Sequence, residues 1–465
     1  MNRKNRAVNG VCGLSLLFGI SASAVPIGVV DSGTDLKHPM LKDHAWVNPG
    51  TTPGYTDDKN GWNFAENNNE IIDYSYLGKF SPDTTKYFEV QLRVIEGTAT
   101  DEDKKWLEEK RKDQAFMKDL MTFANFAHGT HVAGIASRSA VEAHVMAAKI
   151  IPTEVKLPGP RFNYQLMSLF DADTDADASN PMDEMMMKLA MGMIADQQSK
   201  MLIKVGQYLN STKMKVANCS FGTGGKQAEM VVKMIGKMML QRDLTEAEVE
   251  KYSKMFMETV LDKGKAFATS SSGTLFVIAA GNDGADNDKM PVFPANLKLE
   301  NTITVAATRG FDRLASFSNY GLTKVDIAAP GVGILSAIPG EATMVMSGTS
   351  QASPFVANVA GKIMDANPNL TLAQVKQILM STVDKKDFLV GKIVSEGIAN
   401  EERAVRAAHL SVSLGMDDAI KMAKAEVADV KMSLRKHYWK RVMVTGPDSG
   451  NDGQPVEMPS LFKTE

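Results

Sequence analysis

Cysteine is nearly absent from this chain of 465 residues, which contains only Cys12 and Cys219. Two cysteines cannot form a disulfide framework, so the chain is no small disulfide-stapled protein. A large charge excess is also missing, because 52 basic and 55 acidic residues leave a net charge of −3, and nothing indicates nucleic acid as a partner. The hydrophobic content of 44% is ordinary for a globular protein with a substantial core.

The first 24 residues have the three parts of a secretory signal. Basic residues at positions 3, 4 and 6 precede an apolar run from Val11 to Ile20, and Ala22-Ser23-Ala24 provides a small-residue cleavage site. The run is too short to span a bilayer, so we expect no transmembrane segment. The alternative is a buried N-terminal strand or helix. We expect an exported protein, at a periplasmic, cell-surface or extracellular location, in which Cys219 is a lone thiol after cleavage.

Short apolar runs alternate with helical patterns along the chain. This alternation predicts an α/β protein with a doubly wound, mainly parallel central sheet and helices on both faces. The expected strands are residues 25–30, 215–217, 275–280, 302–306 and 325–328.

Helix starts are indicated by threonines that have an acidic or amide residue three positions later. Thr100 predicts a helix from about Asp101 to Phe126, and Thr245 predicts one through about Leu261, while Thr371 marks another start. A further helix is expected from Met182 to Leu209 and is rich in methionine. Its methionines could form an adaptable binding surface or fill gaps in the core.

Two polar segments have both a functional and a plain interpretation. The loop from Pro152 to Pro181 carries four aspartates at alternate positions, 171 to 177, which suit either a hard cation or a solvated acidic loop. Ser413 to Val442 predicts an amphipathic helix that could mediate self-association, with a disordered tail from Thr445 to Glu465. Its basic cluster at 435–441 would face either an anionic membrane surface or solvent.

The segment from Gly348 to Pro354 predicts a serine nucleophile at the start of a helix. Gly348 permits close approach of the backbone to a ligand, and we place Pro354 in the first helical turn, where a missing N–H costs little. Free N–H groups and the helix dipole beside Ser350 would stabilise a developing negative charge.

A serine nucleophile needs a base whose ring is oriented by a third group. The candidate base is His128, in a segment of small residues with a helix expected to begin near it. The candidate orienting group is Asp31, at the carboxyl end of the first expected strand, where open α/β sheets place their sites. Taken singly, such a histidine is usually structural and an Asp-Ser-Gly is usually a turn.

Together these segments resemble the subtilisin-like serine endopeptidases (subtilases, peptidase S8 type). The resemblance rests on Asp31-Ser32-Gly33-Thr34-Asp35, on His128-Gly129-Thr130-His131-Val132-Ala133-Gly134, and on Gly348-Thr349-Ser350 through Pro354, in the Asp, His, Ser order of that family. It covers about residues 25–410. It implies that Asp31, His128 and Ser350 are catalytic and that polypeptides are the substrates.

Further segments agree with this resemblance. Val277 to Gly284 is similar to the family's oxyanion segment, which implies Asn282 as a side-chain donor. The implied substrate-binding residues are Ser220, Phe221, Gly222, Ala279, Ala280 and Gly281, and they indicate an apolar or unselective pocket. No cofactor is implied. Asp57 to Phe64 resembles a shortened calcium loop of some relatives, although a plain turn is the alternative.

The chain also departs from the family pattern. Only Val25 to Val30 separate the expected cleavage site from Asp31, which leaves no room for the usual pro-domain. The expected organisation is a signal peptide (1–24), a peptidase domain (25–410) with helical insertions at about 80–127, 152–214 and 223–272, and a C-terminal extension (411–465). The alternatives to an endopeptidase are a scaffold with a blocked cleft, and an esterase or ligase that uses the same acyl-enzyme.

Overall fold

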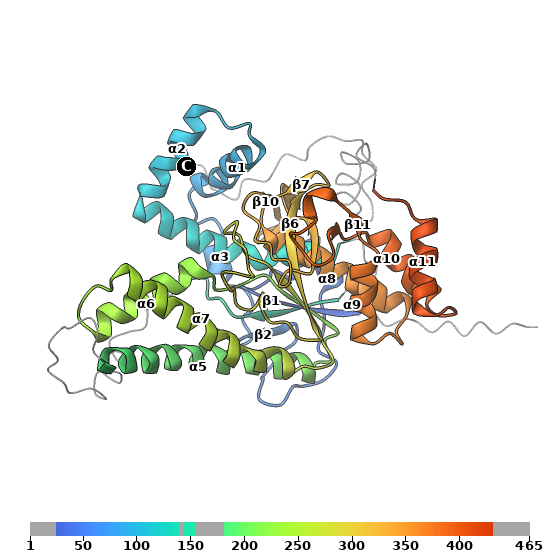
Figure 1. Cartoon of the computed structure of the whole chain (residues 1–465), viewed down its shortest axis with the longest axis horizontal. Coiled ribbons are helices and arrows are strands. Elements are labelled where there is room, and N and C mark those ends of the chain that lie inside the picture. The colour runs from blue at the N-terminus through green and yellow to red at the C-terminus, as the bar shows by residue number, and fades with distance from the viewer. Residues whose placement is uncertain (1–24, 139–143, 155–180, 431–465) are drawn as a thin grey trace, which may run out of the picture.

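The computed structural model describes residues 25–138, 144–154 and 181–430, and its centre is one large sheet (Figure 1). The strands follow the order β11-β12-β8-β6-β5-β4-β1-β3-β2, with β7 paired to β6. The neighbours in the middle of the sheet, from β8 to β2, pair in parallel. The strands of this sheet are β1 (Pro26–Asp31), β2 (Gly61–Asn63), β3 (His144–Lys149), β4 (Val216–Cys219), β5 (Leu275–Ala279), β6 (Thr302–Arg309), β7 (Arg313–Leu314), β8 (Ile327–Pro330), β11 (Asp384–Lys385) and β12 (Gly397–Ile398).

An antiparallel hairpin, β9 (Ile334–Ile338) and β10 (Ala342–Met346), lies outside this sheet. The helices are α1 (Pro82–Glu96), α2 (Asp101–Lys112), α3 (Gln114–Ala136), α5 (Pro181–Ser211), α6 (Gly225–Met239), α7 (Glu246–Thr269), α8 (Thr349–Ala366), α9 (Leu372–Ser381), α10 (Glu401–Leu410) and α11 (Met416–Glu426). Short 3-10 turns are η1 (Lys42–His44), η2 (Tyr74–Tyr76) and η3 (Asp387–Leu389).

The sheet separates two hydrophobic cores, because successive side chains of a strand point to opposite faces. Val29 and Val277 belong to the core shared with α3 and α8 to α11, whereas Val30 and Ile278 belong to the core shared with α5, α6 and α7. Figure 1 shows the second group of helices at the lower left of the sheet and α8 to α11 at its right. The predicted α/β class with helices on both faces is confirmed.

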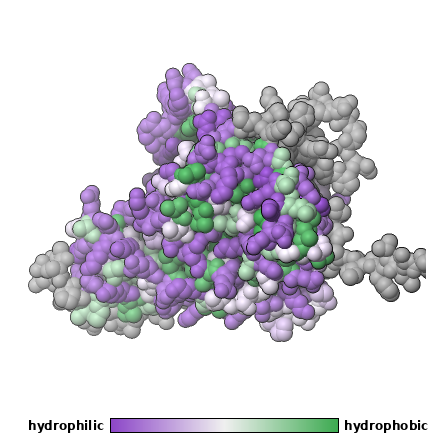
Figure 2. Space-filling view, turned by 45° about the vertical axis from the view of Figure 1, so that its right-hand side comes forward, coloured by the Kyte–Doolittle hydropathy of each residue, from purple (hydrophilic) through white to green (hydrophobic). Residues whose placement is uncertain are grey.

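The expected strands are present as β1, β4, β5, β6 and β8, each buried over nearly its whole length. The methionine-rich helix is α5, which lies beside α7 (Figure 1). Met186, Met187 and Met191 are buried in the core, which agrees with gap filling, while Met182 and Met185 are exposed. On the face shown in Figure 2, hydrophilic residues predominate and apolar residues form scattered patches.

The helix expected from Asp101 to Phe126 is wrong as a single element. Thr100 does form the predicted capping box with Asp103, but α2 ends at Lys112. Asp113 has an extended backbone, with ψ 102°, and its side chain accepts from the Phe116 N–H, so it ends α2 and starts α3. α1 lies inside the expected helical insertion at about 80–127 and has bounds of its own, because Ser81-Pro82 caps its start and Gly97, with φ 76°, ends it.

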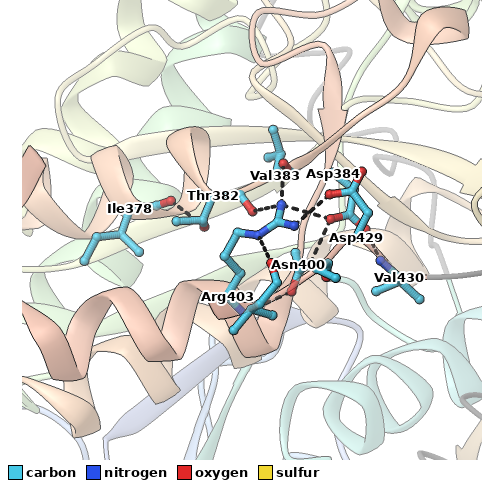
Figure 3. A network of polar contacts seen from close by, with 10 residues as sticks. Ile378, Thr382, Val383, Asp384, Asn400, Arg403, Asp429 and Val430 are labelled. Carbon is cyan, nitrogen blue, oxygen red and sulfur yellow. Dashed lines mark hydrogen bonds and ion pairs between the residues drawn. The ribbon is translucent and has the colours of Figure 1, made fainter. Parts of the chain in front are cut away.

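The helix expected from Ser413 to Val442 is also much shorter, because α11 ends at Glu426. Arg403 of α10 is nearly buried and donates to the Val427 carbonyl at 2.9 Å and to Asp429 Oδ1 at 2.7 Å, while the Val430 N–H donates to Asp384 Oδ2. Figure 3 shows this network, in which Asn400 also donates to Asp384. These bonds attach residues 427–430 to the domain after α11 has ended.

Other expectations concern residues outside the described ranges. They include the signal sequence, the aspartates at 171–177, and the basic cluster and tail beyond residue 430. Within the described part of the chain, no helix has the length and hydropathy that a membrane span requires.

Candidate active site

Asp31 ends β1 in the middle of the sheet, between β3 and β4. Its side chain is fully buried, and Oδ1 lies 2.7 Å from both the Ser32 N–H nitrogen and His128 Nδ1. An ionised carboxylate only accepts hydrogen bonds, so Nδ1 of His128 is the donor. In the neutral ring, Nε2 then carries the free lone pair and can accept a proton.

His128 lies in the second half of α3, so the expected helix start near this residue is wrong. The extra turns before it are stabilised by Phe123 and Phe126, which pack in a hydrophobic cluster with residues of the β9–β10 hairpin. Gly129 explains how the helix approaches the loop after β1. A Cβ at position 129 would lie 2.1 Å from the Gly33 carbonyl oxygen, and the Gly129 N–H donates to Ser32 Oγ at 3.1 Å.

The pKa values of the two histidines in this helix are shifted in opposite directions. Burial lowers the pKa of His128, but the charge of Asp31 and its hydrogen bond outweigh that effect and raise the pKa above its usual 6.5. Burial lowers the pKa of His131 to about 3, and its Nε2 lies 3.1 and 3.0 Å from the carbonyl oxygens of Ile334 and Met344. His131 is therefore a neutral structural residue, and His128, with 26% of its side chain exposed, is the ring that can exchange protons.

Ser350 is the second residue of α8 and is partly exposed. Its hydroxyl donates to the Ser220 carbonyl at 3.3 Å, and the Ser220 hydroxyl donates to the Ser350 carbonyl at 3.0 Å. Ser220 directly follows β4, whose Cys219 is in register with Val30 of β1. Ser350 is therefore bonded to the residue that follows β4, and Asp31 ends the adjacent strand β1. Adjacent strands are typically about 4.8 Å apart, so the serine lies near the Asp31–His128 pair.

Pro354 is the sixth residue of α8, so its expected position in the first turn is wrong. A residue there would normally donate its N–H to the carbonyl four positions earlier, which belongs to Ser350. Proline has no N–H, and the Ser220 hydroxyl fills this role.

Asn282 follows β5 and its side chain is oriented by Thr349. Its Oδ1 accepts from the Thr349 N–H at 2.8 Å and from the Thr349 hydroxyl at 3.0 Å. The oxygen is thus engaged, and the Nδ2 group remains as a donor. It lies beside Gly348, where an added Cβ would be 3.5 Å from Nδ2. Asn282 is exposed, so its amide can meet a ligand at the start of α8.

The two expected substrate-binding segments leave neighbouring parallel strands. Ser220-Phe221-Gly222 follows β4, while Ala279 ends β5 and leads into Ala280-Gly281. Gly222 is pressed against the Phe293 carbonyl, since an added Cβ would lie 2.8 Å from that oxygen. Phe221 is partly buried, with its ring centroid 6.3 Å from that of Phe267. The two segments thus run from the same edge of the sheet, close to Ser350 and Asn282.

The loop from Asp57 to Phe64, which resembles a calcium loop in sequence, is held by hydrogen bonds to other parts of the protein. Asp58 is buried, and its Oδ2 accepts from the Tyr208 hydroxyl at 2.9 Å and from Asn48 Nδ2 at 2.8 Å. These two donors occupy an oxygen that a cation would need. In residues 25–138, 144–154 and 181–430, no cluster of three or more His, Cys, Asp or Glu side chains suits a metal.

The structure thus brings Asp31 and His128 into contact and places Ser350, Asn282 and both substrate segments at the same edge of the sheet. Sequence reasoning gave no role to Ser32 or Thr349, which lie in the matched segments, or to Asn218, which lies two residues before Ser220. Their side chains form hydrogen bonds with other parts of the site, which only the fold reveals.

Comparison with known proteins agrees with this arrangement. The model of the Subtilase family matches residues 22–402, and the chain therefore belongs to the subtilase family. A Thermophilic serine proteinase from Bacillus sp. (strain AK1) is 42% identical over 127 residues, which are 27% of this chain and 29% of the relative. Subtilisin E from Bacillus subtilis (strain 168) is 37% identical over 153 residues, 32% of this chain and 37% of the relative.

Each of these alignments spans roughly a third of the relative. Among solved structures, the A-subunit of the AB5 toxin from E. coli aligns with a TM-score of 0.43 and 20% identity, covering 84% of this chain and 95% of that chain.

Proposed function

We propose that this protein is a serine endopeptidase that cleaves polypeptides through Asp31, His128 and Ser350 and an acyl-enzyme intermediate. Membership of the subtilase family supports a serine peptidase and, with it, polypeptide substrates. The observation that carries the proposal is the 2.7 Å contact between His128 Nδ1 and Asp31 Oδ1, one strand away from the Ser350 hydroxyl. This contact fixes the ring tautomer that a general base requires.

In the proposed reaction, Ser350 Oγ attacks the scissile carbonyl while His128 Nε2 takes its proton. Asp31 holds the ring and stabilises the imidazolium that forms. His128 then gives the proton to the leaving amine, and the peptide bond breaks. A water molecule, activated by the same ring, hydrolyses the acyl-enzyme and restores the Ser350 hydroxyl.

The tetrahedral intermediate carries a negative charge, for which Asn282 Nδ2 and the Ser350 N–H are the proposed donors. We expect Asn282→Ala to lower kcat by about 10²- to 10³-fold, a range taken from the corresponding change in subtilisin, with KM little changed. Kinetics on a peptide anilide measure both constants. Asn296→Ala is a suitable control, since that side chain bonds only to the backbone of its own loop. An equal loss in both variants would contradict the assignment.

Polypeptide recognition is proposed for the two segments beside the serine. Ser220-Phe221-Gly222 would pair its main chain with an extended substrate, and Ala279-Ala280-Gly281 would line the pocket for the residue before the cleaved bond. Their common origin from adjacent strands supports this role. The small side chains of the second segment favour an apolar or unselective pocket.

Hydrolysis of a denatured protein such as casein by the purified chain tests the proposed function. We expect many new amino termini with wild type and none above background with Ser350→Ala. A folded wild-type protein that leaves casein intact would contradict endopeptidase activity and favour the scaffold alternative. Cleavage of small esters with casein left intact would favour the esterase alternative instead.

We also propose export with cleavage after Ala24, because residues 1–24 have the three parts of a secretory signal. Amino-terminal sequencing of secreted protein should begin at Val25.

We further propose that no metal cofactor is needed, since Asp58 is engaged by protein donors. Activity should then survive dialysis against EDTA.

Self-association through the C-terminal helix stays a prediction. The apolar residues Ala419, Ile420 and Ala423 of α11 are buried in its contact with the domain, whereas Met422 of the same helix is exposed. Light scattering of the purified chain measures the mass that decides this point.

A further inference from the structure

The nucleophile's own carbonyl is held in an unusual way. Pro354 cannot donate an N–H to it, so an ordinary helix would leave the Ser350 carbonyl without its partner four residues ahead. The Ser220 hydroxyl, from a different element, donates to it at 3.0 Å. In return, the Ser350 hydroxyl donates to the Ser220 carbonyl at 3.3 Å. The two serines are therefore joined by a reciprocal pair of hydrogen bonds.

A buried series of side-chain hydrogen bonds fixes the Ser220 hydroxyl in this orientation. Asn218 Nδ2 donates to Ser220 Oγ at 2.9 Å, and Asn218 Oδ1 accepts from Ser353 Oγ at 2.7 Å. Asn218 and Ser353 are fully buried, and Ser220 is 6% exposed. Asn218 donates to a lone pair of the Ser220 oxygen, and the hydroxyl proton points toward the Ser350 carbonyl. The series begins on β4 and ends on α8, three residues after the nucleophile.

We propose that Ser220 is a positioning residue, whose hydroxyl replaces the missing Pro354 N–H and holds the Ser350 backbone in its reactive orientation. Asn218 and Ser353 keep that hydroxyl in place. This inference rests on the proposed function, since it assigns a role within the same site. The proposed substrate contacts of Ser220 use its main chain, so its hydroxyl acts on the rate of the chemical step and not on substrate binding.

The first test separates positioning from binding. We expect Ser220→Ala to lower kcat by about tenfold to 10²-fold, where the upper value is the loss that a displacement of about 1 Å can cause, with KM within about twofold of wild type. Ser220→Thr keeps the hydroxyl and should restore most of kcat. The control is Ser395→Ala, because Ser395 is 5% exposed and also donates to a carbonyl, that of Gly397, away from the site. An unchanged kcat in Ser220→Ala would overturn the proposal.

The second test uses the missing N–H itself. Pro354→Ala supplies a donor for the Ser350 carbonyl, so Ser220→Ala should cost much less, both in kcat and in the urea midpoint of unfolding, when Pro354→Ala is also present. Equal costs in the two backgrounds would overturn the proposal while hydrolysis by wild type stands. If wild type hydrolyses nothing, the proposed function fails, and the urea midpoints alone test the role of the Ser220 hydroxyl. A Ser220→Ala shift of equal size in the wild-type and Pro354→Ala backgrounds would overturn the proposal that this hydroxyl replaces the missing N–H. A smaller shift in the Pro354→Ala background would support it.

Discussion

Replacing His128 by alanine should lower kcat by about 10⁶-fold, the scale known for loss of the histidine in subtilisin, while leaving the fold intact. Without the imidazole, no group that accepts the Ser350 proton is paired with Asp31, and a neutral serine hydroxyl is a weak nucleophile. The side chain is 26% exposed, so its removal opens no sealed cavity in the core. Kinetics on a peptide anilide, with thermal unfolding measured alongside, test this expectation.

Two outcomes are informative for this variant. His409→Ala serves as its control, because His409 lies exposed near the end of α10 and should leave kcat unchanged. A His128→Ala protein that unfolds like wild type and keeps more than about 1% of kcat would show that another base operates, since such a residue typically contributes far more.

Asp31→Asn should lower kcat by about 10⁴-fold, with KM little changed. The asparagine amide can donate to His128 Nδ1, which would place the ring proton on Nε2 and leave no lone pair facing the serine. Losing the carboxylate charge also removes what raises the pKa of His128, and the remaining effect of burial lowers it. The acid limb of the pH–kcat/KM profile should therefore move to lower pH.

Asp326→Asn is the matched control for this change. Asp326 is also buried, accepts the Thr304 N–H at 2.8 Å and pairs with Lys298, but it lies beside β6 and β8, away from His128. It should lower the free energy of unfolding and leave the acid limb in place. A profile that moves equally in both variants would mean that a general loss of packing, and not the Asp31 charge, sets the pKa of His128.

Much of this fold could be predicted from sequence, because strands buried on both faces leave continuous apolar runs. β1 and β5 are examples, because each is an uninterrupted apolar run that ends at a residue of the site, Asp31 for β1 and Ala279 for β5. The site edge followed from the rule that carboxyl ends of parallel strands meet on one side. Motif order then identified which aspartate, histidine and serine meet there.

The missed features depend on tertiary contacts. α3 extends before His128 because Phe123 and Phe126 find apolar partners in the β9–β10 hairpin, more than 200 positions away in the chain. α11 ends early because Arg403 and Asp384 bind the backbone and side chains of residues 427–430. Helical periodicity in the sequence does not show these tertiary partners, so it misplaces the start of α3 and the end of α11.

The role of Ser220 shows the same limit at the site. Its position in the expected substrate segment predicts a main-chain function, but its hydroxyl bond to Ser350 becomes visible only when β4 and α8 are placed together. Pro354 was expected to cost little, whereas it removes a donor that another element supplies.

The most direct test of the Asp31–His128–Ser350 assignment is the rate at which a fluorophosphonate labels Ser350, measured against pH. The assignment predicts one modified serine, identified by mass spectrometry, with a rate that falls on acidification through a pKa above 6.5 in wild type and through a lower one in Asp31→Asn. Labelling that is absent in the folded wild type, that occurs at another residue, or that keeps the same pH dependence in Asp31→Asn would contradict it.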